Sequence, residues 1–151
     1  MILLSIRRLA AWSLALASAA AAAQTDQPQQ LPTIRLTTGM HVLQVQVAQT
    51  PQQQEIGLMF RQAMGTNEGM LFVFDAPRQQ CFWMKNTILP LSVAFIADDG
   101  TVVNVDDMKP QTLDNHCSTK PVRYVLEMNV GWYARSGVKA GSRFGGEPFA
   151  K

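Results

Sequence analysis

Residues 89–108, LPLSVAFIADDGTVVNVDDM, decide the fold that this sequence predicts. The run from Leu89 to Ala97 is apolar and rich in residues that favour strands. A second such run, TVVNVDDM, covers residues 101–108. Between them, Asp98-Asp99-Gly100 is a strong turn signal, because aspartate and glycine tolerate the backbone angles of tight hairpin turns. The stretch therefore predicts a β-hairpin.

More short strands are expected on either side of this hairpin. Residues 69–74 (GMLFVF) are apolar on both faces, whereas residues 122–129 (VRYVLEMN) alternate. Residues 33–49 also alternate, and Thr38-Gly39 within them supplies a turn, so they predict a second hairpin. The remaining expected elements are strands at 81–86 (CFWMKN) and 139–144 (KAGSRF), a loop at 109–121 and a helical turn within 130–138.

One short helix of two to three turns is expected in residues 50–63 (TPQQQEIGLMFRQA). Thr50 can cap it, and Gln53 completes a Thr-x-x-Gln capping box. Gly57 weakens the helix by about 1 kcal/mol. A glycine at this position therefore suggests that the helix backbone approaches the sheet closely. The expected apolar face consists of Ile56, Met59, Phe60 and Ala63. Many short strands with one helix near the start predict a mainly β domain, either a compact β-sandwich or a partly open barrel.

The start of the chain has the pattern of a secretory signal peptide. A basic pair, Arg7-Arg8, precedes an apolar stretch, and small residues up to Ala23 offer a cleavage site before Gln24. The expected organisation is a signal peptide at 1–23, a flexible tether at 24–32 and a single domain at 33–151. The expected location is periplasmic or secreted, with no membrane span after cleavage.

The charge balance argues against a nucleic-acid partner. The chain has 13 basic and 11 acidic residues. Arg7 and Arg8 leave with the signal peptide, so 11 residues of each sign remain. Nucleic-acid binding needs a clustered basic face, which this balance does not indicate. The expected partner is a small molecule or an envelope protein, and the expected state is a monomer.

The two cysteines, Cys81 and Cys117, both fall in the exported domain. In an oxidising compartment a lone pair favours a disulfide. The alternative is a buried Cys81 that packs as a small hydrophobe, with Cys117 free in a loop.

Four motifs, in order along the chain, resemble the DUF192 family. They are GLMFR (57–61), GMLFVF (69–74), CFWMKNTILPLSVAFI (81–96) and PVRYVLEMNVGW (121–132). The resemblance covers roughly residues 33–144. It implies a small, mainly β single domain, often exported or tethered in bacteria. It implies no activity and no catalytic residues.

The candidate binding residues lie in two of the strand sequences. Alternation within 81–87 places Trp83 and Lys85 on one face. Lys85 and Asn86 are then donors over an aromatic floor, at the mouth of a polar cleft. Alternatively, Lys85 packs its stem on Trp83 and extends its ammonium group to water. Glu127 needs a partner in an otherwise apolar strand, and Lys85 is the expected one.

Two arginines complete the candidate set. Arg61 and Arg123 could together bind a carboxylate or phosphate, because guanidinium groups match planar anions. Alternatively, Arg61 caps the C-terminus of the helix, the use that we favour for it, and a structural ion pair explains Arg123 as well as a site does.

The function that these residues favour is a non-catalytic, ligand- or partner-binding module of the cell envelope. One alternative is a hydrolase-like enzyme that uses Glu127 with Lys85. A second is a periplasmic copper-binding protein, because seven methionines, His41 and His116 remain in the exported chain. No Gly-x-Ser-x-Gly, His-x-His or Cys-x-x-Cys motif occurs. We therefore expect no cofactor, no metal ligands and no catalytic residue.

Overall fold

The hairpin predicted from residues 89–108 forms the far edge of the sheet. The computed structural model describes residues 26–149. Strands β5 (Leu91–Ile96) and β6 (Val102–Met108) pair antiparallel around the Asp98-Asp99-Gly100 turn. Gly100 has a φ of 85°, a conformation that glycine adopts without steric cost. The expected hairpin is confirmed.

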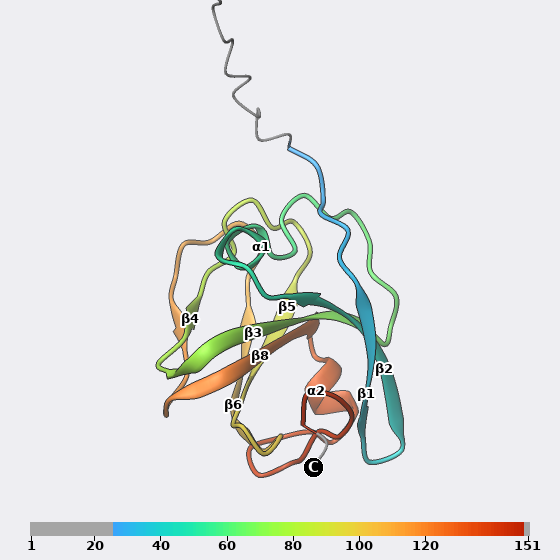
Figure 1. Ribbon diagram of the computed structural model, residues 1–151. Helices are drawn as coiled ribbons and strands as arrows, with labels where there is room; N and C mark the ends of the chain where they lie inside the picture. The colour runs from blue at the N-terminus through green and yellow to red at the C-terminus, as the bar shows by residue number, and fades with distance from the viewer. Residues whose placement is uncertain (1–25, 150–151) are drawn as a thin grey trace, which may run out of the picture.

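Six strands form one mixed sheet in the order β1-β2-β3-β8-β5-β6 (Figure 1). Its other members are β1 (Thr33–Thr38), β2 (His41–Ala48), β3 (Glu68–Arg78) and β8 (Val122–Asn129). Strands β1 and β2 form the second expected hairpin, and β2 pairs parallel with β3. A separate two-stranded sheet consists of β4 (Cys81–Phe82) and β7 (His116–Cys117).

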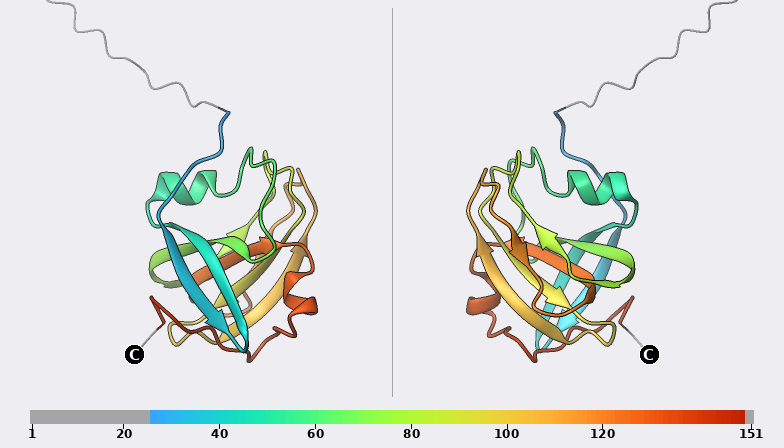
Figure 2. Two further views of the ribbon diagram at one scale, coloured as in Figure 1. Left: turned by 90° about the vertical axis from the view of Figure 1, so that its right-hand side faces the viewer. Right: turned by 90° about the vertical axis from the view of Figure 1, so that its left-hand side faces the viewer.

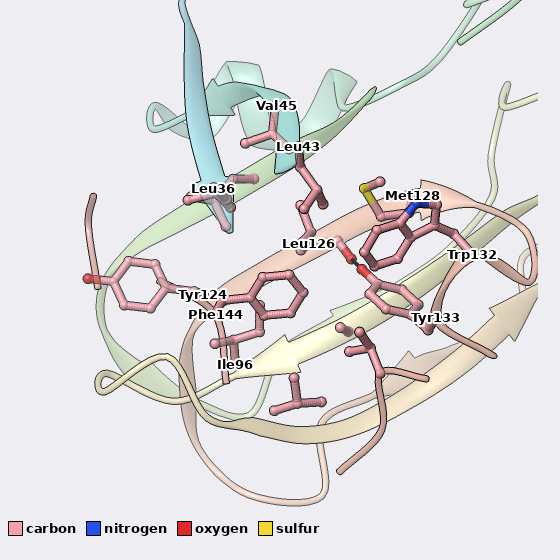
Figure 3. Packing of buried hydrophobic residues seen from close by; sticks show 14 of the residues in the cluster. Leu36, Leu43, Val45, Ile96, Tyr124, Leu126, Met128, Trp132, Tyr133 and Phe144 are labelled. Carbon is pink, nitrogen blue, oxygen red and sulfur yellow. Dashed lines mark hydrogen bonds between the residues drawn. The ribbon is translucent and has the colours of Figure 1, made fainter. Parts of the chain in front are cut away.

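The central part of the sheet is largely apolar because both of its faces are covered. All six residues of β5 are buried. On one face, Leu126 and Met128 of β8 pack in a cluster that includes Trp132, Tyr133 and Phe144 (Figure 3). The Tyr133 hydroxyl donates a hydrogen bond to the Leu126 carbonyl at 2.6 Å. The second cluster lies on the opposite face and comprises Ala48, Leu58, Met70, Phe72, Met84, Leu91, Val93, Phe95, Met108, Val122 and Val125.

Two short helices lie at different ends of the sheet (Figure 2). Helix α1 (Pro51–Ile56) begins with the expected capping box: Thr50 accepts from the Gln53 backbone, and the Gln53 side chain accepts from the Thr50 backbone. Helix α2 (Trp132–Arg135) is the helical turn expected within 130–138. Neither helix, in the part of the chain that the structure describes, is long and apolar enough to cross a bilayer.

Helix α1 is shorter than expected. It ends at Ile56, because Gly57 adopts a φ of 50° and closes it, and Phe60 has a φ of 63° in the turns that follow. Residues 59–63 are therefore not helical. The expected close approach of Gly57 to the sheet is confirmed: a Cβ at this position would lie 3.2 Å from the Phe72 ring.

One expected strand is longer in the prediction than in the structure, and another does not form. Only Cys81 and Phe82 of the 81–86 stretch are in a strand; the Met84 amide instead donates to the Thr112 carbonyl, and Asn86 has a φ of 52°. Residues 139–144 form no strand, because Arg143 makes only an isolated bridge. In the other direction, β3 continues beyond the expected 69–74 to Arg78.

The fold class is confirmed as mainly β, with an open sheet rather than a closed barrel and two short helices rather than one. Cys81 and Cys117 lie opposite each other in β4 and β7 and form the expected disulfide. The predicted signal peptide lies outside the described residues. Within the predicted tether, the Gln29 amide donates to the Gln53 and Gly57 carbonyls, so the chain contacts the domain from Gln29 onward.

Candidate functional site

Glu127 is a carboxyl group in the middle of an apolar core. It lies on β8, directly across from Met70 of β3 and Val93 of β5, and the side chains of cross-strand neighbours share a face. Met70 and Val93 are fully buried, and Glu127 itself is only 4% exposed. Within residues 26–149 the Glu127 carboxyl has no hydrogen-bond partner and no ion pair. Among the described residues, the fully buried side-chain atom without a hydrogen-bond partner is Arg123 Nε, so the Glu127 oxygens are not completely sealed off and can be reached through an opening.

A small pocket of about 30 Å³ connects Glu127 with the surface. We call it the Glu127 pocket. Its walls come from α1 and the turns after it, from β3 and from the segment after β4. The lining residues are Gln54, Glu55, Ile56, Gly57, Leu58, Met59, Phe72, Phe82, Trp83, Thr87 and Glu127. Helix α1, which contributes to this lining, lies at one end of the molecule (Figure 1).

Burial determines the protonation of Glu127. Removal from water disfavours the charged form and raises the pKa of Glu127 from 4.5 to about 8. At neutral pH the carboxyl is therefore mostly protonated. Tyr133 is also fully buried; its pKa is raised by desolvation and, secondarily, by the nearby Glu127.

Two loops that carry strained backbone form the rim of the pocket. The Phe60 amide donates to the Asn86 carbonyl at 3.0 Å, and both residues have positive φ. Asparagine tolerates this conformation, whereas for a phenylalanine it is an outlier. Such outliers persist only where the surroundings hold them, and they concentrate at functional sites.

An aromatic ring and a cation stand beside the pocket mouth. Trp83 is 44% exposed, and the Lys85 ammonium lies 5.4 Å from its ring centroid. The disulfide between Cys81 and Cys117 fixes the strand that leads into Trp83. The hydrogen of the Thr87 hydroxyl is already engaged, because it is donated to the Lys85 carbonyl at 3.0 Å.

The structure brings some of the predicted site residues together and separates others. Trp83 and Glu127 line the pocket, whereas Lys85 lies beside the Trp83 ring and Asn86 precedes the lining residue Thr87 in the chain. The expected Lys85–Glu127 ion pair is wrong: no such pair occurs among the described residues. The reason is that β4 ends at Phe82, so Lys85 is exposed in a turn instead of facing β8.

The two arginines do not join this site. Arg61 donates to the Gln46 side chain at 2.9 Å, against β2. Arg123 pairs with Asp98 at 3.3 Å, at the turn between β5 and β6. The expected anion site that combines them is therefore not formed.

Sequence reasoning missed Met59, Phe82 and Thr87 as lining residues. Helical spacing places Met59 on a helix face, although Gly57 is also a signal for a helix end. Phe82 and Thr87 come from a stretch whose alternation predicts a single strand.

Other hollows are larger but contain no buried carboxyl. One of about 260 Å³ lies against Ile34, Leu71 and Pro148, and one of about 430 Å³ lies near His41 and Arg143. A site needs convergent polar groups as well as space. Of the hollows in residues 26–149 described here, the Glu127 pocket is the one with a buried, unpartnered carboxyl.

The methionines considered as copper ligands mostly serve the core. Met70, Met84 and Met128 are buried in the two clusters. His116 is held by Asp106, with 2.6 Å between Nδ1 and the carboxylate. Residues 26–149 contain no group of three or more His, Cys, Asp or Glu side chains that could hold a metal ion.

Comparison with known proteins identifies a family and two similar structures. The family described as "DUF192: Uncharacterized ACR" matches residues 34–145. A crystal structure from Sinorhizobium meliloti 1021, of a candidate transcription regulator, is 44% identical, with a TM-score of 0.71 over 74% of this chain and 90% of that chain. A protein of unknown function from Novosphingobium aromaticivorans DSM 12444 is 36% identical, with a TM-score of 0.74 over 77% and 86%. No curated protein matches the chain.

Proposed function

The chain belongs to the DUF192 family, and we propose that it is an exported, non-catalytic module that binds a small ligand in the Glu127 pocket. One observation carries this proposal: a buried carboxyl without a partner faces a small opening beside an exposed tryptophan. The pocket is small, about 30 Å³, and it combines the aromatic side chains of Phe72, Phe82 and Trp83 with the carboxyl of Glu127.

The rigid surroundings support a binding role. The disulfide anchors the strand before Trp83, and the hydrogen bond from Phe60 to Asn86 joins the two rim loops. A rim that is ordered before the ligand arrives loses less conformational entropy on binding. A sheet covered on both faces supplies the fixed floor.

Export is part of the same proposal. A signal-peptide pattern, a nearly neutral mature chain and a disulfide all favour a periplasmic or secreted location. Intact-mass measurement of the protein from the periplasmic fraction tests this, and the expected mass begins at Gln24 or a few residues from it. A full-length mass in the membrane fraction would contradict export.

The binding role is tested with the protein purified from its native envelope. Native mass spectrometry is expected to show an added small mass. Glu127→Gln and Trp83→Ala should each lose that mass, whereas Arg123→Met should keep it, because Arg123 pairs with Asp98 away from the pocket. The same mass retained in both pocket variants would refute this site.

A hydrolase-like enzyme is the second candidate. The raised pKa of Glu127 favours it, because a carboxyl that stays protonated near neutral pH can act as a general acid. It would also need a base within hydrogen-bond reach. Lys85 makes no ion pair with Glu127, and the Thr87 hydroxyl bonds to a backbone carbonyl. Binding without turnover is therefore the better-supported function.

A further inference from the structure

The chemistry of the Glu127 pocket restricts the ligands that it can satisfy. The Glu127 carboxyl is a buried polar group of the pocket lining that has unused hydrogen-bonding capacity. Its immediate cross-strand neighbours, Met70 and Val93, are apolar. A ligand that satisfies the ionised carboxylate must therefore bring hydrogen-bond donors, a positive charge or both.

The size of the pocket restricts the ligand further. About 30 Å³ holds one or two groups of the size of a water molecule. A primary ammonium group is of this size, whereas a trimethylammonium group or a sugar ring is not. The pocket therefore admits a head group, and the rest of the ligand must lie across the rim.

The rim already shows that it accepts a cation. The Lys85 ammonium sits 5.4 Å from the Trp83 ring centroid, within the range of cation–π attraction. Phe72 and Phe82 pack edge to face, with ring centroids 4.7 Å apart, and both line the pocket. Aromatic walls beside a buried carboxyl suit an alkylammonium ligand, because the rings contact its methylene groups and favour its charge.

We propose that the Glu127 pocket binds the ammonium group of a primary alkylamine, with Glu127 as its counter-ion and the alkyl chain against Phe82 and Trp83. The proposal rests on the binding function proposed above and names the ligand class for that site. The source of the ammonium group is either a free amine or the side chain of a lysine.

The charges around the pocket are compatible with this ligand. Glu55 of α1 is the other ionisable side chain in the lining, and its negative charge favours a cation. The positive charge of Lys85, beside Trp83, acts against a cationic ligand, but Lys85 is exposed to solvent. On the opposite face of the sheet, the Tyr133 hydroxyl is bonded to the Leu126 carbonyl. From β3 and β5, the groups that face Glu127 are uncharged.

Binding is coupled to release of a proton. Before binding, the buried carboxyl of Glu127 is mostly protonated at neutral pH. The ammonium group binds the carboxylate form, so the carboxyl proton passes to solvent and one proton is released for each amine bound. The apparent affinity therefore rises by about tenfold from pH 6 to pH 7 and levels off above about pH 8.

The test is an NMR titration of the mature domain with n-butylamine, followed through the Trp83 indole and the Glu127 amide. The neutral n-butanol, the anionic n-butyrate and the bulky tetramethylammonium ion are the matched probes. We expect n-butylamine to bind at least tenfold more tightly than each of them, with the stated pH dependence. Glu127→Gln should weaken it at least tenfold, and Glu147→Gln, an exposed carboxylate elsewhere, should leave it unchanged.

A second titration, with Nα-acetyl-lysine N-methylamide, separates the two sources. Binding of both amines supports lysine side chains as ligands, and binding of n-butylamine alone supports a free amine. If n-butanol or n-butyrate binds as tightly as n-butylamine, and Glu127→Gln weakens that binding, the pocket is a binding site but the amine proposal is overturned. If no probe shifts the pocket signals and the natively purified protein carries no added mass, both proposals fail.

Discussion

Glu127→Gln is expected to stabilise the protein at neutral pH. The substitution keeps the size of the side chain but removes its ability to ionise. Burial raises the pKa of Glu127 to about 8 in the folded protein, against 4.5 in its ordinary state. The folded protein therefore binds this proton more tightly than the unfolded chain. The resulting stability is present in full below pH 4.5 and is lost as the pH rises from there to about 8.

The size of this change in unfolding free energy follows from the difference between the two pKa values of Glu127. Each pH unit between the two pKa values costs about 1.4 kcal/mol. At pH 7 the wild type should therefore have lost about 3 kcal/mol of unfolding free energy relative to strongly acidic conditions, from this group alone. Between pH 5 and pH 7 the loss is roughly 2–3 kcal/mol. The glutamine amide has no charged form, so the variant should not show this loss.

Urea unfolding followed by circular dichroism at pH 5, 6, 7 and 8 measures both proteins. We expect the difference between variant and wild type to grow with pH and to level off near pH 8. Glu55→Gln, which removes an exposed carboxyl at the same pocket, should keep the wild-type slope. Parallel pH profiles for wild type and Glu127→Gln would show that the carboxyl ionises without penalty and would refute its burial.

Three further changes have expected outcomes. Lys85→Met should alter the unfolding free energy by no more than ~0.5 kcal/mol, since Lys85 is exposed and without an ion pair among residues 26–149. If a denaturant melt shows a loss of several kcal/mol instead, Lys85 has a buried charged partner and this reasoning is wrong. Reduction of the Cys81–Cys117 bond, which spans 36 residues, should cost roughly 4 kcal/mol in the chain-entropy estimate. If titration shows two free thiols after reduction and the melt is nevertheless unchanged, this estimate is contradicted. Gly57→Ala should destabilise by more than ~1 kcal/mol, because φ is 50° and the new Cβ meets the Phe72 ring at 3.2 Å; thermal melting checks it, and an unchanged midpoint would argue against the close approach.

Local chemistry made parts of the fold predictable from sequence. The turn at Asp98-Asp99-Gly100 and the capping box at Thr50 and Gln53 depend on residues within a few positions of each other. The apolar run of β5 identified a strand, and the run at 69–74, apolar on both faces, identified the start of β3; both also follow from the sequence alone. Such features need no knowledge of distant contacts.

The candidate site was less predictable because its environment comes from remote segments. Glu127 was recognised as a polar residue in an apolar strand, but its neighbours Met70 and Val93 belong to strands far away in the chain. Alternation beyond Phe82 failed, since the Met84 amide bonds to the carbonyl of Thr112, which belongs to a distant loop. The partner assigned to Glu127 was therefore wrong, while Glu127 and Trp83 both line the same pocket and remain predicted site residues.

The C-terminal segment has a consequence for solubility. Gly145 bridges to Thr37 of β1, and Arg143 bridges to Thr101 beside β6, so one short segment contacts both edges of the open sheet. Unpaired strand edges are templates for association with other chains. A chain that ends before residue 142 would lose the backbone pairing at Thr37 and at Thr101, which adds unpaired N–H and C=O groups at both edges. Proteolytic trimming at this end is therefore expected to increase association between molecules.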